Sequence, residues 1–382
     1  MRKVLATLTI AVFLLLGIGI VLLASAGTVR AQDLYGVPYY FFQSQLKWLG
    51  ISMVVLFVAS VFDYRLWKRI PWLTVAFFCF AVLLLVLVLI PGVSQSVKKG
   101  SARWLSIAGH RLGQPSELAK IAMVVVFAVW LDRIGAAVKG FFKGFLVPCV
   151  MLGIFAGLLL LEPDFGATAV VGVLGLSMMF VAGVRIRYLL AAAVVGVCGV
   201  GVLLMNNSNR MSRIMAFMDP DSNSDAGHQL AQSILSFKNG GALGVGYTRS
   251  IQKFRYLPEA HTDFIFAIGG EEFGIIFSIG VLILFVTFAV CGFLIAVRAQ
   301  DRLGKMLAFG MTFLLAFQAA FNIGVVTGCL PTKGIALPCI SYGPTNLLVA
   351  MAAVGILMNV GRRVVQEDRD GDLLAKNIPV EL

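Results

Sequence analysis

The chain carries little charge for its length. Charged residues make up 13% of its 382 residues and hydrophobic residues 59%, whereas about 25% of an ordinary soluble domain is charged. This composition excludes a water-soluble globular protein. The sequence also contains no internal repeat, no low-complexity tract and no polar segment large enough to form a soluble domain with its own core.

Histidine is scarce, and cysteine offers little chemistry. The three histidines, His110, His228 and His261, are far apart, whereas a zinc site takes several closely supported ligands, so we expect no such site. Four of the six cysteines fall inside apolar runs, where cysteine behaves as a small apolar residue. Cys329 and Cys339 flank a short loop, and the sequence leaves open whether they form a disulfide.

Long apolar runs dominate the sequence instead. A helix of about 20 apolar residues crosses the hydrocarbon core of a bilayer, and a segment in lipid must be helical because its backbone amides find no water there. We therefore predict an all-α polytopic membrane protein that forms one domain over residues 1–382. Its ten spans are expected near residues 4–25, 48–63, 72–91, 116–132, 145–161, 166–184, 188–205, 264–297, 306–329 and 345–361.

Two of these apolar runs are unusual in length. The apolar part of the first exceeds the 7 to 15 residues of a typical signal-peptide core, so we expect it to be retained as a span. The run at 264–297 is too long for one straight crossing. Its first turns, which contain Glu271 and Glu272, are expected at the membrane interface or inside a cavity.

Basic residues in the short loops define the expected topology. These residues, together with Arg2 and Lys3 at one terminus and Arg362 and Arg363 near the other, all fall on the same side of the ten-span arrangement. The positive-inside rule identifies this side as the cytoplasmic one. Both termini are then cytoplasmic, with a short solvated tail at 362–382 and one large extracytoplasmic loop at 206–263 between spans 7 and 8. Topology thus accounts for the net charge of +12 without nucleic acid, and the further cations in the outer segments indicate an anionic ligand.

Several polar residues lie where they are costly. Ionisable groups at membrane depth cost roughly 2.5 to 3.5 kcal/mol each, so they indicate function by default. Glu117 and Lys120 share one helix face at i, i+3 spacing, and the turn Glu162-Pro163-Asp164 follows the fifth span. A salt-bridged network that fixes helix positions and a catalytic role are equally compatible with these residues. For Trp104, a functional role and a role as an anchor at the membrane interface are equally compatible with the sequence.

The stretch Tyr256–Phe264 places Glu259, His261 and Asp263 just before an apolar run resumes. Asp263 stands at the start of a helix, where a carboxylate also favours the helix dipole by about 0.3 to 1 kcal/mol. A helix cap does not require Pro-Glu-Ala-His-Thr before it. The pattern therefore favours a functional role for Asp263 over a cap.

This stretch and the residues after it resemble the SEDS family (shape, elongation, division and sporulation proteins). The likeness spans nearly the whole chain, through residues 256–267, Gly270-Glu271-Glu272-Phe273-Gly274, Arg103-Trp104, residues 114–120, residues 162–166, Arg213-Ile214, Gln252-Lys253 and Leu330–Gly334 with Leu337-Pro338. Glu259-Ala260-His261 and Pro331–Gly334 are closer to the division branch than to the elongation branch. The chain departs from the family at Pro344-Thr345-Asn346, where Pro344 stiffens a turn that glycine would leave free, and at His228, where tyrosine is common.

The resemblance implies a peptidoglycan glycosyltransferase of the bacterial cytoplasmic (inner) membrane, acting at the division septum. Its substrate would be lipid II, a disaccharide-pentapeptide on undecaprenyl diphosphate, and its partners a class B penicillin-binding protein transpeptidase and other divisome proteins. No cofactor is certain, and a divalent cation (Mg²⁺ or Mn²⁺) remains open. A flippase for lipid II and a non-catalytic divisome scaffold remain as alternatives.

The resemblance also implies roles for individual residues. Asp263 would be the general base of an inverting displacement, while His261 and Glu259 would rather shape the loop than take part in chemistry. Substrate-binding residues would be Arg213, Lys253, Arg103, Trp104, Lys333, Arg249, Gln252 and His261, with Arg255 as a further candidate cation. A structural network around the cavity would comprise Glu117, Lys120, Asp164, Glu259 and Glu272.

Overall fold

The structure, a computed structural model, describes residues 1–90, 94–97, 101–107, 110–205, 211, 215, 217–218, 225–254 and 256–376. Within these residues nine helices are long and apolar enough to cross a membrane, so the all-α polytopic prediction is confirmed. They are α1 (Arg2–Ala26), α3 (Tyr40–Val61), α5 (Pro71–Leu89), α6 (Pro115–Ile134), α7 (Val147–Leu161), α8 (Phe165–Ala182), α12 (Ile265–Arg298), α13 (Arg302–Val326) and α14 (Pro344–Lys376).

Further helices complete the bundle. α9 (Ile186–Met205) is apolar over the shorter segment Ile186–Val202 and corresponds to the remaining predicted span. A 3₁₀ turn at Gly135–Lys139 and a π-helical turn at Phe141–Leu146 join α6 to α7. Among the described residues three further helices lie between the spans: α2 (Thr28–Tyr35), α4 (Leu66–Arg69) and α11 (Asp225–Gly240).

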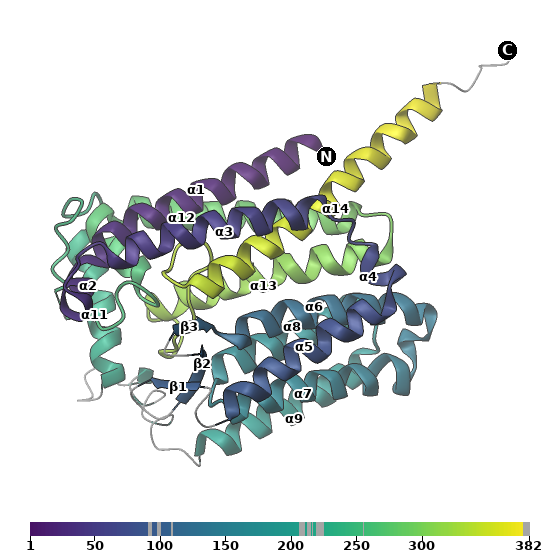
Figure 1. The fold of residues 1–382 in the computed structure, drawn as a ribbon, viewed down its shortest axis with the longest axis horizontal. Helices are drawn as coiled ribbons and strands as arrows, with labels where there is room; N and C mark the ends of the chain where they lie inside the picture. Colours follow the sequence, from purple (N-terminus) through teal and green to yellow (C-terminus); the bar gives the residue numbers. More distant parts are fainter. Residues whose placement is uncertain are drawn as a thin grey trace.

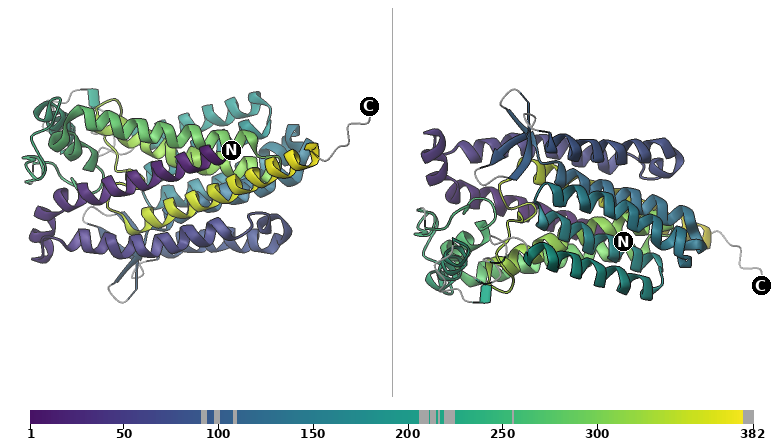
Figure 2. Two further views of the ribbon diagram at one scale, coloured as in Figure 1. Left: turned by 90° about the horizontal axis from the view of Figure 1, so that it is seen from above. Right: turned by 90° about the horizontal axis from the view of Figure 1, so that it is seen from below.

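The spans run side by side along the long axis of the molecule (Figures 1 and 2). α1, α3, α12, α13 and α14 form one group and α5 to α9 the other, and α6 and α8 pack against α13 between them. The start of α1 and the end of α14 lie at the same end of the bundle (Figure 1). α2, α11 and a small sheet lie at the opposite end, which we call the loop end.

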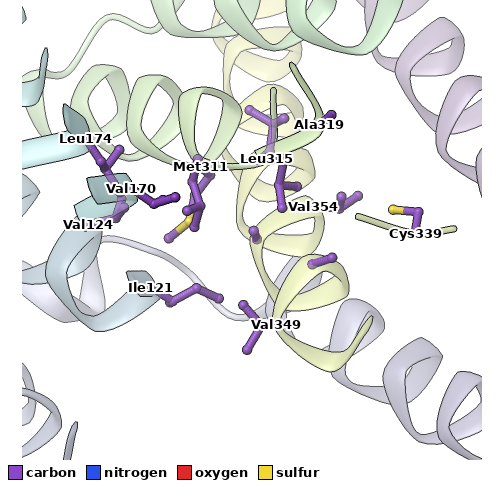
Figure 3. Packing of buried hydrophobic residues seen from close by; sticks show 14 of the residues in the cluster. Ile121, Val124, Val170, Leu174, Met311, Leu315, Ala319, Cys339, Val349 and Val354 are labelled. Atoms are coloured by element: carbon purple, nitrogen blue, oxygen red, sulfur yellow. The ribbon is translucent and has the colours of Figure 1, made fainter. Parts of the chain in front are cut away.

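The core lies where the two groups meet. Ile121 and Val124 of α6 and Leu174 of α8 are fully or almost fully buried against Met311 and Leu315 of α13 (Figure 3). Helices in lipid gain no hydrophobic free energy by associating, so close packing of side chains holds them together. This packed junction fixes the relative position of the two groups of helices.

α12 is broken at Gly274, which adopts φ 80° and ψ −176°, a conformation that favours glycine. The turn that follows α11 supplies partners for the interrupted backbone. Ile275 N–H donates to Gly241 O at 3.0 Å, and Val245 N–H donates to Glu271 O at 3.0 Å. The expectation that 264–297 is not one straight crossing is confirmed.

A three-stranded antiparallel sheet, absent from our sequence predictions, follows α5. Its strands are β1 (Ser94–Val97), β2 (Ser101–Ile107) and β3 (His110–Gly113), in the order β1-β2-β3. Strands this short have no apolar alternation long enough to mark them against a polar loop. The sheet leads directly into α6 and carries Trp104 to the loop end.

Two predicted boundaries and one predicted turn were wrong. α3 begins at Tyr40 rather than near 48, because the polar residues before the apolar run continue the same helix. α14 continues to Lys376, so the chain beyond Arg363 is not simply a solvated tail; Glu367 pairs with Arg65 at 2.9 Å. Pro344 is the first residue of α14, where proline costs nothing, and does not stiffen a free turn. All six cysteines are free.

Candidate active site

A cavity of about 250 Å³ opens at the loop end, where four separate parts of the chain meet. We call it the central cavity. Asp263 comes from the loop before α12, and Glu117 and Lys120 come from the first two turns of α6. The other polar contributors are Trp104, Gln114, Asp164, Glu259, Thr262, Tyr342, Thr345 and Asn346.

Asp263 is half-buried at the wall of this cavity. α12 begins only at Ile265, with Phe264 in the N-cap position and no side-chain cap hydrogen bond. The helix-cap interpretation would need the carboxylate one residue later. The position of Asp263 instead depends on the residues that hold its backbone.

Asn322 of α13 holds that backbone in place. Its Nδ2 donates to the backbone oxygens of Asp263 and Ile335, both at 2.7 Å, and its side chain is 1% exposed. One amide therefore joins the loop before α12 to the loop before α14. Asn322 was not predicted from the sequence, because only ionisable side chains in the spans were taken as indicators of function. A lone amide in an apolar run is also costly there and is an indicator of the same kind.

Gly334 makes the second contact. A Cβ built on Gly334 would lie 2.6 Å from Oδ2 of Asp263, a distance that no methyl group can occupy. The carboxylate therefore lies directly against the backbone of the loop before α14. Together with the bonds of Asn322, this contact fixes where the carboxylate enters the cavity.

Lys120 lies across the cavity in a buried ion pair. Its Nζ is 2.7 Å from Oε1 of Glu117, with side chains 3% and 13% exposed. Asp164 lies nearby as the N-cap of α8, where it accepts from Ala167 N–H at 3.2 Å and from Gln114 Nε2 at 3.4 Å. The i, i+3 geometry predicted for Glu117 and Lys120 is confirmed, and the Glu162–Asp164 turn brings Asp164 into the same cavity.

Two buried polar atoms of the cavity wall have no hydrogen-bond partner among the described residues. They are Oε2 of Glu117 and Nδ2 of Asn346, whose side chain is only 8% exposed. A buried group left without a partner costs about 1 to 3 kcal/mol. The Glu117 oxygen is an acceptor and the Asn346 nitrogen is a donor. The cavity is therefore complementary to a ligand that carries both hydroxyl or amide hydrogens and acceptor oxygens.

The central cavity is also more acidic than basic. Four carboxyl groups (Glu117, Asp164, Glu259 and Asp263) and one ammonium group (Lys120) line it. A wall of this kind suits the uncharged, hydroxyl-bearing part of a ligand better than a bare diphosphate.

Lys253 lies elsewhere, in a buried network behind the loop. Its Nζ is 3.1 Å from Oε1 of Glu272, with side chains 4% and 0% exposed, and it donates to Ser25 Oγ at 2.9 Å and Thr248 O at 2.6 Å. Ser25 Oγ donates to the same Glu272 oxygen at 2.5 Å. This arrangement gives Lys253 and Glu272 a structural partner each and keeps both out of the central cavity.

Glu271 organises the adjacent loop. It accepts hydrogen bonds from the hydroxyl of Ser250, from Ile251 N–H at 3.3 Å and from Gln252 N–H at 3.3 Å. Gln252 is therefore buried in the loop as well, while the Arg249 side chain is exposed. Neither of them lines the central cavity.

Lys333 lies beside the cavity, next to Gly334. Its Nζ is 5.5 Å from the centre of the Phe165 ring, a cation–π distance, and its Cε lies 2.8 Å from where a Cβ on Gly166 would stand. Arg213 and Arg255 lie outside the described residues, and the structure describes Arg103 only as part of the β2 backbone.

The described residues contain no group of three or more His, Cys, Asp or Glu side chains placed to hold a metal ion. This chain therefore offers, within that part, no ready-made protein cage for Mg²⁺ or Mn²⁺. The sequence left a role for a divalent cation open, and the described residues do not change that.

His261 packs behind the Asp263 loop and does not line the cavity. Its ring stacks on Phe41 with centroids 4.3 Å apart and 22° between the planes, and its backbone oxygen accepts from Tyr342 N–H at 3.1 Å. Burial lowers the pKa of His261 to about 4, an effect that Arg30 reinforces and Glu259 opposes. His261 is thus an uncharged spacer at neutral pH.

This shift predicts a pH dependence of stability. Between the ordinary pKa of 6.5 and the folded-state pKa of about 4, the unfolded chain binds a proton at His261 and the folded protein does not. Stability should therefore fall by about 1.4 kcal/mol per pH unit as pH drops through this window, and level off below it. His261→Phe, which can keep the stack on Phe41, should reduce that slope. Thermal unfolding in detergent at pH 7.5 and pH 5 measures it, and a wild-type-to-variant difference that does not change with pH would contradict it.

The chain is similar to known proteins along nearly its whole length. Residues 6–366 match a family model described as "Cell cycle protein". A protein of Geobacter metallireducens named "Probable peptidoglycan glycosyltransferase FtsW" is 41% identical over 91% of this chain and 91% of its own length. One of the same name from Coxiella burnetii is 38% identical over 93% of this chain and 95% of its own.

Solved structures share the fold of this chain. One, described as "Structural coordination of polymerization and crosslinking by a peptidoglycan synthase complex", matches with a TM-score of 0.76 and 25% identity over 94% of this chain and 98% of that one. The crystal structure of the rod shape determining protein RodA of Thermus thermophilus matches with a TM-score of 0.68 and 25% identity over 93% and 95%. The helical membrane fold of this chain is thus one already seen in solved structures.

Proposed function

Since the chain belongs to the FtsW, RodA and SpoVE family of cell cycle proteins, we propose that it is a peptidoglycan glycosyltransferase that polymerises lipid II into glycan strands. The observation that carries the proposal is the central cavity. There Asp263 faces a wall that holds one donor and one acceptor without a hydrogen-bond partner in the described part of the chain. The names of the FtsW relatives support the same activity.

The reaction joins two lipid-linked sugars. The 4-hydroxyl oxygen of the acceptor sugar attacks the anomeric carbon of the donor, a new C–O bond forms, and the bond to the undecaprenyl diphosphate breaks with inversion. The diphosphate leaves with the bonding electron pair. The hydroxyl proton must go to a base on the acceptor side, as in inverting glycosidases.

Asp263 is our candidate for this base. A carboxylate placed beside the attacking hydroxyl can take its proton, and a positioned base contributes roughly 10² to 10⁴ in rate. Asn322 and Gly334 fix its position. The free Oε2 of Glu117 and Nδ2 of Asn346 would bind hydroxyl and acetamide groups of the sugar.

Gly334→Ala tests the importance of that position. The added methyl group would have to displace the Asp263 carboxylate, which lies 2.6 Å from its site. We expect polymerisation to fall at least about tenfold, since an ångström of misplacement can cost far more. Polymer formed from purified lipid II measures the effect, with Gly153→Ala as control because a Cβ there meets nothing within 4 Å. Equal activity of the two variants would contradict the prediction.

The leaving diphosphate needs positive charge, which the central cavity does not supply in excess. Lys333 lies beside the cavity, and Arg103, Arg213 and Arg249 remain candidates, as does a divalent cation that arrives with the diphosphate. Lys253 is a weaker candidate, because its ammonium group is already paired with Glu272.

The proposed setting follows from topology and from the neighbours. The positive-inside pattern supports a loop end, and with it a central cavity, on the outer face of the cytoplasmic membrane. The resemblance of the sequence to the division branch supports the division septum. A class B penicillin-binding protein is the expected partner. The match to a synthase complex that couples polymerisation and crosslinking supports that expectation.

A lipid II flippase and a divisome scaffold are the competing functions. A flippase needs polar groups that continue toward the cytoplasmic side, whereas the polar residues of the central cavity gather at the loop end. The deciding experiment reconstitutes the protein with labelled lipid II, with and without its transpeptidase, and measures polymer and leaflet exchange together. Polymer without exchange supports the proposal; exchange without polymer, or neither, refutes it.

A further inference from the structure

A second pocket lies at the end of the bundle opposite the loop end. It lies between the first turns of α1 and the later part of α14, two helices that are far apart in sequence. α1 and α14 cross closely at Gly361, where an added Cβ would lie 3.0 Å from Cδ1 of Leu5. Beyond this crossing α14 continues away from the bundle (Figure 1). The two helices therefore diverge and leave a wedge between the first turns of α1 and residues 362–366 of α14.

The wedge holds a pocket of about 420 Å³, which we call the α1–α14 pocket. Leu5, Ala6 and Val365 line it with apolar atoms. Thr9 also lines it, but its hydroxyl already donates to Leu5 O at 2.8 Å and makes no demand on a ligand. The pocket therefore has an apolar floor.

Two guanidinium groups line the same pocket. Arg2 and Arg362 are both exposed, and of the two only Arg362 has a described protein contact, a long one of 3.5 Å to Ser60 O. Arg298 adds a third cation close by, since its Nη1 lies 3.4 Å from the sulfur of Met1. None of the described residues that line the pocket is acidic.

Two acids near the pocket, one on α14 and one in the α3–α4 turn, are engaged elsewhere. Glu367 pairs with Arg65 at 2.9 Å, and Asp63 pairs with Arg363 at 3.0 Å. These ion pairs hold α14 in its extended form, and none of the ion pairs among the described residues includes Arg2 or Arg362. A pocket with cations at its mouth and an apolar floor, between spanning helices at their basic end, has the chemistry that binds anionic lipid headgroups.

We propose that the α1–α14 pocket binds one anionic phospholipid of the membrane leaflet on the basic side. Its phosphodiester lies between the guanidinium groups of Arg2 and Arg362, and the upper part of one acyl chain lies on Leu5, Ala6 and Val365. The site is remote from the central cavity and its occupancy does not depend on the proposed activity.

The test uses the full-length protein in a neutral detergent, titrated with phosphatidylglycerol or phosphatidylcholine and observed by native mass spectrometry. The double variant Arg2→Gln/Arg362→Gln should bind phosphatidylglycerol about 30-fold more weakly, at about 1 kcal/mol for each cation. Its affinity for phosphatidylcholine should change little. The matched control, Lys139→Gln/Arg187→Gln, removes two cations from the same side outside the pocket.

A second variant separates a lipid from a free phosphate. Ala6→Trp fills the floor and keeps both cations, so it should weaken phosphatidylglycerol binding while the soluble headgroup, glycerol phosphate, binds as before. Three results would overturn the proposal: unchanged phosphatidylglycerol affinity in the double arginine variant, an equal loss in the control, or an Ala6→Trp variant that binds the lipid normally.

Discussion

Asp263→Asn should abolish glycan polymer formation from purified lipid II while the protein still folds and inserts into the membrane. Asparagine keeps the size and the backbone contacts, including the 2.7 Å bond from Asn322 to the Asp263 backbone oxygen, but it cannot accept the hydroxyl proton. A loss of about 10² to 10⁴ in rate is expected for a general base. Polymer length and yield on gels, with thermal unfolding in parallel, measure the two halves of the prediction.

Glu259→Gln serves as the matched control. Glu259 lines the same cavity four residues earlier but is exposed, so its loss should change the rate far less. Binding of lipid II to the Asp263→Asn protein should survive. If the two variants lose activity equally, the effect comes from the charge of the cavity and not from a base at Asp263.

Lys253→Met should destabilise the protein more than any exposed substitution. The change leaves the fully buried Glu272 carboxylate, now 3.1 Å from the lysine ammonium, with only the Ser25 hydroxyl as a described side-chain partner. Removing one partner of a buried ion pair typically costs about 3 to 5 kcal/mol. Thermal unfolding of the detergent-solubilised protein measures the loss.

The double variant Lys253→Met/Glu272→Gln identifies the cause. If Lys253 is mainly structural, removing the orphaned charge should restore most of the stability and with it most of the activity. If Lys253 binds the diphosphate, stability returns but polymerisation does not. Arg249→Gln, an exposed cation of the same loop, should leave stability unchanged and reports what loss of a surface charge alone does.

The spans were predictable because lipid leaves the backbone one choice. An apolar run of sufficient length must be helical, so α5, α6 and α8 begin within a residue of their predicted starts. The start of α3 and the course of α14 beyond Arg363 were missed, because outside the bilayer a helix depends on neighbours such as Arg65 and not on hydropathy. The sheet that carries Trp104 gave no periodic signal for the same reason.

Part of the candidate site was also predictable. Glu117, Lys120 and Asp164 were conspicuous as charges in apolar surroundings, and the structure brings them to the cavity that Asp263 lines. Sequence could not distinguish Lys253, which points into a buried pair, from a cation that faces a ligand. Asn322 was missed because its importance lies in two backbone oxygens that come together only in the fold.

The broken helix α12 bears on how this protein can be recombined with its relatives. The turn after α11 bonds to α12 on both sides of Gly274, through Glu271, Glu272 and Ile275, so the loop and the first turns of the span share one set of backbone hydrogen bonds. They form one module. A chimera that exchanges only the loop would cut through that set, whereas one that carries the donor sequence from α11 through Ile276 would transfer it whole.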